Sequence, residues 1–122
     1  MPVLRIVDSI TELNSGDAGC IAIIGSHGGL SSARYALAAR PQLSVFNDAG
    51  GGLDKAGLAA LDFLQAHDLA ACVVAHHSAR IGEARSTLTS GVVSHANAAA
   101  SALGVHIGWS CQQVVNRLAC QK

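Results

Sequence analysis

Side chains that can transfer protons or bind anions follow three short apolar runs of this sequence. The runs occupy residues 21–24, 43–46 and 71–75, and they lead into the segments GSHGG from Gly25, NDAGGG from Asn47 and HHSAR from His76. Uninterrupted apolar runs of this length are typical of strands covered on both faces of a parallel sheet. Because ligands of such sheets bind outside the carboxyl ends of the strands, we expect these segments to form one site.

Four of these residues have side chains suited to chemistry. Arg80 follows a buried strand in a protein with few charges, and its guanidinium suits a bidentate contact with a carboxylate. His27 lies in a glycine-rich segment, where its ring packs little, so we predict that it transfers protons. We expect Asp48 to orient a histidine or act as a base, and His76 to assist. The alternatives are an ion pair of Arg80 with Asp48 or Glu83, and turns capped by His27 or Asp48.

The glycine-rich segments predict a binding surface around these groups. Their backbone amides can donate to carboxylate or phosphate oxygens. The serines are expected to act as donors, because the sequence contains no G-x-S-x-G nucleophile motif, and it contains no P-loop or dinucleotide fingerprint. Neighbours in an extended segment point to opposite sides, so we expect His76 to face the site and His77 to face away. The predicted binding residues are Ser26, Gly28, Gly29, Asn47, Gly50, Gly51, Lys55, Ser78 and Arg80.

The residue types also permit a metal site, but their spacing does not support one. The candidate ligands are His27, Asp48, His76 or His77, and His95. No short-range pattern such as H-E-x-x-H is present, so we predict neither a metal nor another cofactor. Ser94, His95 and Asn97 open the alanine-rich helix and are interpreted as a solvent-facing polar stripe; the alternative is that they add a wall to the pocket.

The composition limits the class of protein and its partners. The chain has 122 residues, enough for one domain, and half are apolar whereas 13% are charged. The net charge is zero and no basic cluster is present, which argues against nucleic acid as a partner. No apolar run approaches the ~18 residues of a membrane span, so we expect no membrane partner. Such a sparsely charged surface predicts contact with other subunits, and we expect a homo-oligomer that binds a small molecule.

Four cysteines, at positions 20, 72, 111 and 120, show no C-x-x-C spacing. Two of them lie in or beside strand-like runs, where buried free thiols are common. The N-terminal segment lacks the charged and then apolar pattern of a secretory signal. We therefore expect reduced structural cysteines in a cytoplasmic protein.

The first half of the chain predicts strands joined by two helices. The expected strands are 3–7, 20–24 and 43–46, with a brief helical turn near 11–13. The first helix is expected to begin at Ser31 as N-cap and to end by Arg40, because Pro41 follows. The second is expected to be capped by Asp54 and to continue to about His67.

The second half predicts a strand at 71–75, no assigned structure at 80–91 and an alanine-rich helix at 92–103 closed by Gly104. A short extended piece is expected at 105–108. Ser110 and Gln113 form a capping-box pattern that opens the last helix. Strands and helices therefore alternate, which predicts a single α/β domain over residues 1–122. We expect a three-layer sandwich with a largely parallel sheet and right-handed crossovers.

The motifs GSHGG, FNDAG and SARIG together resemble an uncharacterised family of short bacterial α/β proteins that carry them at matching places. The resemblance spans residue 25 to the last helix. It implies the fold, and it carries no established activity and no catalytic residue. The tail LGVHIGWSCQQVV is similar to the helix–turn–helix ending of many small α/β domains, which concerns packing and not chemistry.

Together the residues predict a small oligomeric enzyme acting on a carboxylated or amide-bearing metabolite, as a hydrolase or as a lyase or isomerase. Arg80 and the glycine amides would hold the anion, and His27 would transfer protons. Two alternatives use the same loops. One is a non-catalytic module that binds a small anion, and the other is an oligomerisation subunit whose polar strand ends line subunit contacts.

Overall fold

The computed structural model describes residues 3–51 and 58–119, and in this part of the chain five strands form one sheet. The strands are β1 (Leu4–Val7), β2 (Ile21–His27), β3 (Leu43–Asn47), β4 (Ala70–Val74) and β5 (Val93–Ala96). They lie side by side in chain order, with β1 to β4 parallel and β5 antiparallel to β4. The predicted α/β fold with a largely parallel sheet is confirmed.

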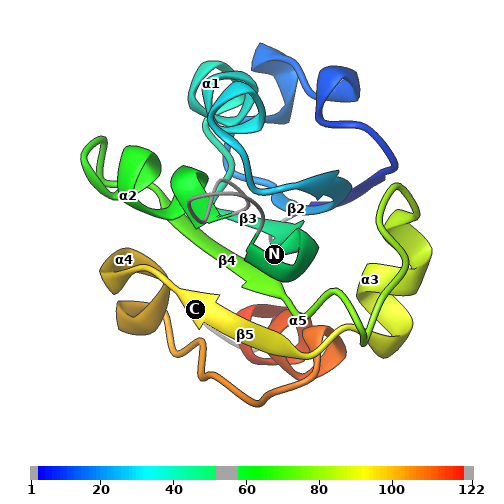
Figure 1. The fold of residues 1–122 in the computed structure, drawn as a ribbon. Coiled ribbons are helices and arrows are strands. Elements are labelled where there is room, and N and C mark those ends of the chain that lie inside the picture. Colours follow the sequence, from blue (N-terminus) through cyan, green and yellow to red (C-terminus); the bar gives the residue numbers. More distant parts are fainter. Residues whose placement is uncertain (1–2, 52–57, 120–122) are drawn as a thin grey trace.

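Helices cover both faces of this sheet. They are α1 (Leu30–Ala39), α2 (Ala59–Gln65), α3 (Ala84–Ser90), α4 (Ala98–Ala102) and α5 (Cys111–Ala119), with short 3-10 turns η1 (Ile10–Glu12), η2 (Ser15–Asp17) and η3 (Ala49–Gly51). α1 and α2 lie on one side of the sheet, and α4 and α5 lie on the other (Figure 1). α3 packs on the same side as α5. The three layers follow from apolar strands that need cover on both faces.

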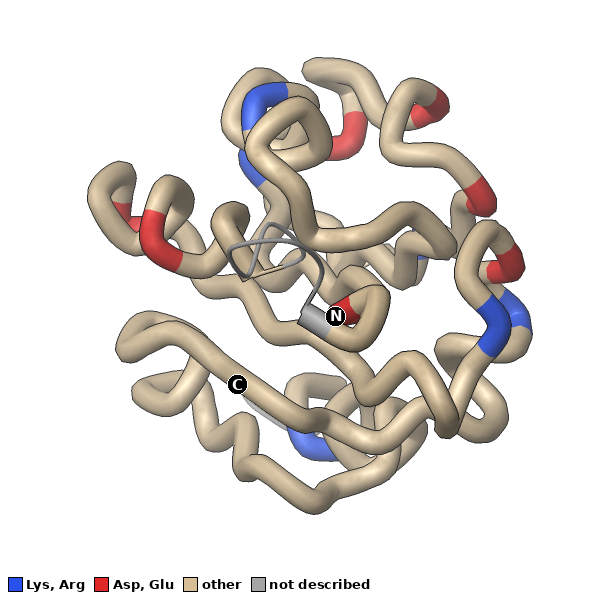
Figure 2. Tube along the Cα trace, in the orientation of Figure 1, with Lys and Arg blue, Asp and Glu red and all other residues tan. Residues whose placement is uncertain are grey.

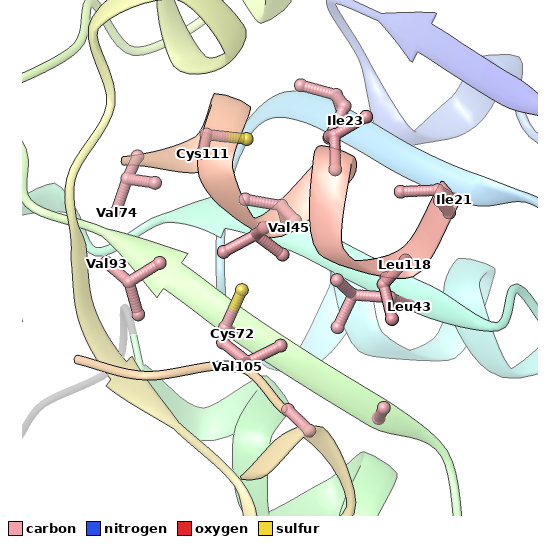
Figure 3. Packing of buried hydrophobic residues seen from close by; sticks show 14 of the residues in the cluster. Ile21, Ile23, Leu43, Val45, Cys72, Val74, Val93, Val105, Cys111 and Leu118 are labelled. Atoms are coloured by element: carbon pink, nitrogen blue, oxygen red, sulfur yellow. The ribbon is translucent and has the colours of Figure 1, made fainter. Parts of the chain in front are cut away.

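Two apolar cores, one on each face, account for the uninterrupted hydrophobic runs of the strands. Successive strand side chains point to opposite faces, so both sets must be apolar. Figure 3 shows the core under α5, where Ile21, Ile23, Leu43 and Val45 of the sheet meet Leu118. The opposite core packs the alternate strand residues against the buried alanines of α1 and the leucines of α2. Small alanine side chains let α1 approach the sheet closely.

The first helix begins earlier than predicted. Ser31 lies inside α1, and the N-cap is Gly29, which has no side chain to cap with. His27 Nδ1 accepts a hydrogen bond from the Gly29 amide at 3.0 Å, so an imidazole fixes the backbone at the start of the helix. The predicted end is confirmed, because Arg40 adopts a left-handed conformation at the C-cap, directly before Pro41.

The helix predicted at 92–103 is wrong in its first half, which forms strand β5. β-branched Val93 pairs with Val74 at the edge of β4, and this pairing overrides the helical preference of the alanines that follow. Asn97 then caps α4, because its Oδ1 accepts the Ala100 amide at 2.9 Å. Gly104 follows the helix with a positive φ of 100°, as predicted.

The remaining predictions meet mixed outcomes. Ser110 and Gln113 form the predicted capping box of α5, with distances of 3.1 and 2.9 Å between backbone nitrogens and side-chain oxygens. The piece at 105–108 is an irregular segment with a turn rather than an extended one, and α3 occupies part of the unassigned stretch. α2 ends at Gln65, and its predicted cap Asp54 lies outside the described residues.

Three cysteines are free and buried, as predicted, and Cys120 lies outside the described residues. Figure 3 shows Cys72 of β4 and Cys111 of α5 in the core under α5. Burial raises the pKa of the Cys111 thiol to about 12, and it also raises the pKa of Cys72 and of Cys20. These thiols therefore stay protonated and pack as small apolar groups.

Candidate functional site

The chain leaves β3 and β4 toward opposite faces of the sheet. After β2 and β3 it continues to α1 and α2 on one face, whereas after β4 it continues to α3 on the other. Loops that diverge in this way leave a crevice between the carboxyl ends of the two strands, where open α/β sheets bind ligands. The predicted residues Asp48 and His76 directly follow β3 and β4, and thus lie at this crevice.

A cavity of about 690 Å³ lies at this crevice. Its described lining residues are Asn47, Ala49, His76, His77, Ser78, Ala79, Arg80, Ile81, Ser86 and Ser90. Every ionisable side chain of this lining is a histidine or an arginine. The volume suits a small metabolite, and the lining favours a negatively charged one.

Asp48 is the most extensively bonded polar residue of the site, and it is buried. Its Oδ1 accepts the backbone amides of Gly50 at 2.8 Å and of His76 at 2.9 Å. Its Oδ2 accepts the hydroxyl of Ser94 at 2.7 Å. Burial raises the pKa of Asp48, but the hydrogen bonds from Ser94, Gly50 and His76 and the charge of His76 outweigh it, so the pKa lies below its ordinary value.

The His76 ring lies beside this carboxylate. Its Nδ1 is 3.4 Å from Asp48 Oδ1, and its side chain is 57% exposed. A carboxylate beside Nδ1 favours the tautomer that carries the proton there and leaves the Nε2 lone pair for a substrate. The Asp48–His76 pair therefore has the arrangement of an oriented acid–base pair at the wall of the cavity.

The expectation that His77 faces away differs from the structure. Residues 76–78 form a turn, because β4 ends at Val74, so neighbouring side chains do not alternate as in a strand. Both histidines line the cavity, and their rings meet edge to face with centroids 5.5 Å apart. The ring with a described contact to Asp48 is that of His76.

Arg80 lies at the mouth of the same cavity. Its side chain is 82% exposed, and its Nε is 3.8 Å from Glu83 Oε2. This ion pair with Glu83 is one of the alternatives that the sequence offers for Arg80. A surface ion pair of this length and exposure contributes at most about 1 kcal/mol. A bound carboxylate can therefore displace Glu83 at little cost.

Three hydrogen bonds hold the segment that carries these residues across the strand ends. Asn47 Nδ2 donates to the Ala79 carbonyl at 3.1 Å. The Gly82 amide donates to the Gly25 carbonyl at 2.6 Å, and the Ala84 amide donates to Asp8 Oδ1 at 2.9 Å. The segment from His76 to Ala84 thus spans the ends of β4, β3 and β2, which places Arg80 over the crevice.

The structure does not bring His27 to the cavity. The residue pairs with Asn47 in the sheet, but it is not among the described residues that line the cavity. Its Nδ1 accepts a hydrogen bond from the Gly29 amide. His27 therefore caps a turn, which is the alternative role that the sequence offers for it. The amide of Gly28 donates to the Asn47 carbonyl, and that of Gly50 donates to Asp48. These three glycine amides serve the protein itself.

The predicted serines make hydrogen bonds within the protein. Ser26 Oγ accepts the Ile10 amide at 3.1 Å. Ser78 Oγ donates to the Ala75 carbonyl at 2.6 Å and accepts the Val92 amide at 2.9 Å, so both of its hydrogen-bonding functions are occupied. Lys55 lies outside the described residues. Within residues 3–51 and 58–119, no three His, Cys, Asp or Glu side chains gather closely enough to hold a metal ion.

Sequence reasoning missed the contribution of β5 and α3. Ser94 donates to Asp48, and Ser86 and Ser90 line the cavity. The preferred prediction placed Ser94 in a solvent-facing stripe, with a place in the pocket wall as its alternative. Its error follows from the misassigned helix, since only a strand beside β4 brings Ser94 next to the end of β3.

Comparisons with known proteins leave the family open. No protein-family model matches the chain, and no curated protein and no solved structure is significantly similar to it. Among the described residues, no helix combines the length and the apolar character needed to cross a bilayer.

Asp48→Asn should destabilise the fold in a pH-dependent way. At pH 7 we expect a loss of about 1.5–3 kcal/mol, because the carboxylate accepts hydrogen bonds as a charged, buried group. Its pKa is lowered from 3.8 in the folded state, so its contribution is complete above the unfolded pKa and is lost as the pH falls through the folded one. Urea unfolding between pH 2 and 7 should show wild type and variant converging at the acidic end. The exposed Asp62→Asn variant is the control, and a constant Asp48→Asn penalty over that range would contradict the pKa direction.

Proposed function

We propose that the protein is an enzyme that binds a small carboxylated or amide-bearing metabolite in the cavity between the ends of β3 and β4. The single observation that carries this is the Asp48–His76 pair at the wall of a cavity whose ionisable lining residues, among those that the structure describes, are histidine or arginine. Arg80 would hold the carboxylate at the mouth through its guanidinium. His76 would then transfer a proton to or from the bound molecule.

The step that fits this geometry is a proton transfer next to the bound carboxylate. The Nε2 lone pair of His76 takes a proton from carbon or oxygen, and the ring becomes an imidazolium whose charge Asp48 balances. In a lyase step the bond pair left on the substrate forms a double bond while a leaving group departs with its own bond pair and takes the proton back from His76. In an isomerase step the pair moves into the adjacent carbonyl group, and His76 returns the proton to a neighbouring atom. This is lyase or isomerase chemistry. Hydrolysis would need a water activated in the same way, because the hydroxyl of Ser78 is occupied.

His76 replaces His27 as the proposed proton-transfer residue. Its ring lines the cavity and touches Asp48, whereas the ring of His27 caps the start of α1. Catalytic groups must reach a common reacting atom, which favours two residues of one cavity. Gly28, Gly29 and Gly50 are no longer proposed as anion ligands, because their amides donate within the protein, whereas Gly51 stays a prediction.

Arg80→Ala should weaken the binding of small carboxylates and reduce the thermal shift that they cause. A thermal-shift screen of the wild type against small carboxylates, amides and phosphates identifies the ligand class, and a ligand at 100 times its Kd stabilises the fold by about 2.7 kcal/mol. Loss of a charged hydrogen-bond partner costs about 1.5–3 kcal/mol, which is roughly 10- to 150-fold in Kd.

Arg85→Ala is the matched control, because Arg85 lies on α3 beside a separate hollow with Asp8 and Glu12. It should leave the shift unchanged. A carboxylate shift of undiminished size in Arg80→Ala would contradict the proposed anchor. No shift in either protein would favour the structural alternative, in which the strand ends line subunit contacts.

We also propose a homo-oligomer that uses the weakly charged side of the molecule. In Figure 2 the part formed by α4, β5 and α5 carries little charge, and Arg117 is the one charged residue between positions 93 and 119. Val92 and Ile107 are exposed on this part. Interface cores are depleted in charged residues, and sedimentation equilibrium measures the mass directly. The free, buried cysteines support a cytoplasmic location.

A further inference from the structure

Ser94 and His95 of β5 extend the Asp48–His76 pair of the candidate site. Asp48 turns Oδ1 toward His76 Nδ1 at 3.4 Å, and it turns Oδ2 toward Ser94 Oγ at 2.7 Å. His95 Nδ1 lies 3.1 Å from Ser94 Oγ. The four side chains therefore form one chain of contacts, from the exposed ring of His95 to the ring of His76 in the cavity.

The direction of the hydrogen bonds in this chain is fixed at its centre. Asp48 is a carboxylate with a lowered pKa, so it only accepts, and the single hydroxyl hydrogen of Ser94 must point to it. The Val73 carbonyl is 3.5 Å from Ser94 Oγ, too far to compete for that hydrogen. The Ser94 oxygen is then the acceptor for His95, whose Nδ1 must carry a proton.

This arrangement holds the Asp48 carboxylate in place rather than passing protons through it. A relay would protonate Asp48, which would weaken the hydrogen bonds from Gly50, His76 and Ser94 that the charged form accepts. Rotation of the carboxyl group would move Oδ1 away from His76 Nδ1. The short bond from Ser94 to Oδ2 opposes that rotation, because the second oxygen would lose its partner.

We propose that Ser94 is a positioning residue that locks Asp48 against His76, and that His95 fixes the Ser94 hydroxyl for this purpose. The inference rests on the proposed function, in which His76 transfers the proton. In this proposal, two residues of the antiparallel strand β5 determine the tautomer of His76, which follows β4. Besides Asp48, the described titratable side chain in contact with His76 is His77, whose ring meets that of His76 edge to face. The contact with Asp48 is made by His76.

The test measures the tautomer of His76 by NMR of the ligand-free protein labelled with ¹⁵N-histidine. In the wild type we expect the proton on Nδ1. In Ser94→Ala we expect a mixture of tautomers, because a loosened carboxylate no longer holds the proton on Nδ1. Ser94→Thr keeps the hydroxyl on a strand and should restore the wild-type spectrum. Asp48→Asn should give the largest change in the His76 tautomer ratio, and the changes in the other variants are compared with it.

Two further variants make the test specific. His95→Gln should change the His76 spectrum in the same direction as Ser94→Ala but less, and it keeps the test valid if Ser94→Ala does not fold. Ser101→Ala, on the exposed side of α4, should change nothing. A His76 tautomer that is identical in wild type, Ser94→Ala and His95→Gln would overturn the positioning role. The readout needs no substrate, so a changed His76 spectrum without turnover of any carboxylate would reject the enzyme and keep the positioning role.

Discussion

His76→Gln should lower kcat by about 100- to 10,000-fold on a carboxylate that the wild type turns over, which is the range for loss of a general acid or base. Glutamine keeps a polar side chain of similar reach but cannot accept and return a proton at neutral pH. The Kd should change by less than about threefold, because the carboxylate is held by Arg80 and not by the imidazole. Turnover is measured on the carboxylates that the thermal-shift screen identifies, with affinity measured separately by calorimetry.

His77→Gln is the matched control for this prediction. Both histidines line the cavity, but His76 is the one beside the Asp48 carboxylate. We expect His77→Gln to retain most of kcat. Equal losses of kcat in both variants would contradict the proposal that Asp48 makes His76 alone the proton-transfer residue. A wild type that binds carboxylates without converting any of them would support the non-catalytic binding module instead.

The location of the site could be predicted from the sequence because it depends on local patterns. Apolar runs followed by polar and glycine residues identified the ends of β2, β3 and β4, and parallel strands place those ends at one edge. Asp48, His76 and Arg80 were found in this way. A local pattern does not distinguish His27 from His76, since both follow strands. The two rings differ in the group beside them: the Asp48 carboxylate lies beside His76, and the Gly29 backbone amide lies beside His27. The tertiary structure determines which group each ring meets.

The part that the sequence could not predict depends on pairing between distant segments. Alanines after Asn97 gave the whole stretch 92–103 a helical character, and the strand pairing of Val93 with Val74 cannot be read from either residue alone. The role of Ser94 was lost with that strand. The path of the segment after His76 is equally non-local, because it is set by a contact between Gly25 and Gly82, which are 57 positions apart in the chain.

Gly25→Ala should destabilise the protein strongly and remove the cavity. A Cβ on Gly25 would lie 2.6 Å from the Gly82 carbonyl carbon and 2.7 Å from both the Asp8 oxygen and the Glu83 nitrogen. All three are backbone atoms, so no side chain can turn away, and the segment that carries Arg80 must move as a whole. Overpacking of this kind costs about 3 kcal/mol or more, which lowers Tm by roughly 10 °C in a chain of this length. Thermal unfolding measures the stability. The rise in Tm on addition of a small carboxylate shows whether the cavity still binds its ligand.

Gly82→Ala, on the other side of the same contact, separates crowding from backbone conformation. Its Cβ would meet open space, with no heavy atom within 4 Å, but the residue has a φ of +83°. A left-handed conformation costs an alanine about 1–2 kcal/mol, so Gly82→Ala should be the milder variant and should keep carboxylate binding. Similar losses in the two variants would mean that the strand ends tolerate movement of this segment. A larger loss in Gly25→Ala, together with loss of the carboxylate shift, would show that close backbone contact at the end of β2 holds Arg80 over the crevice.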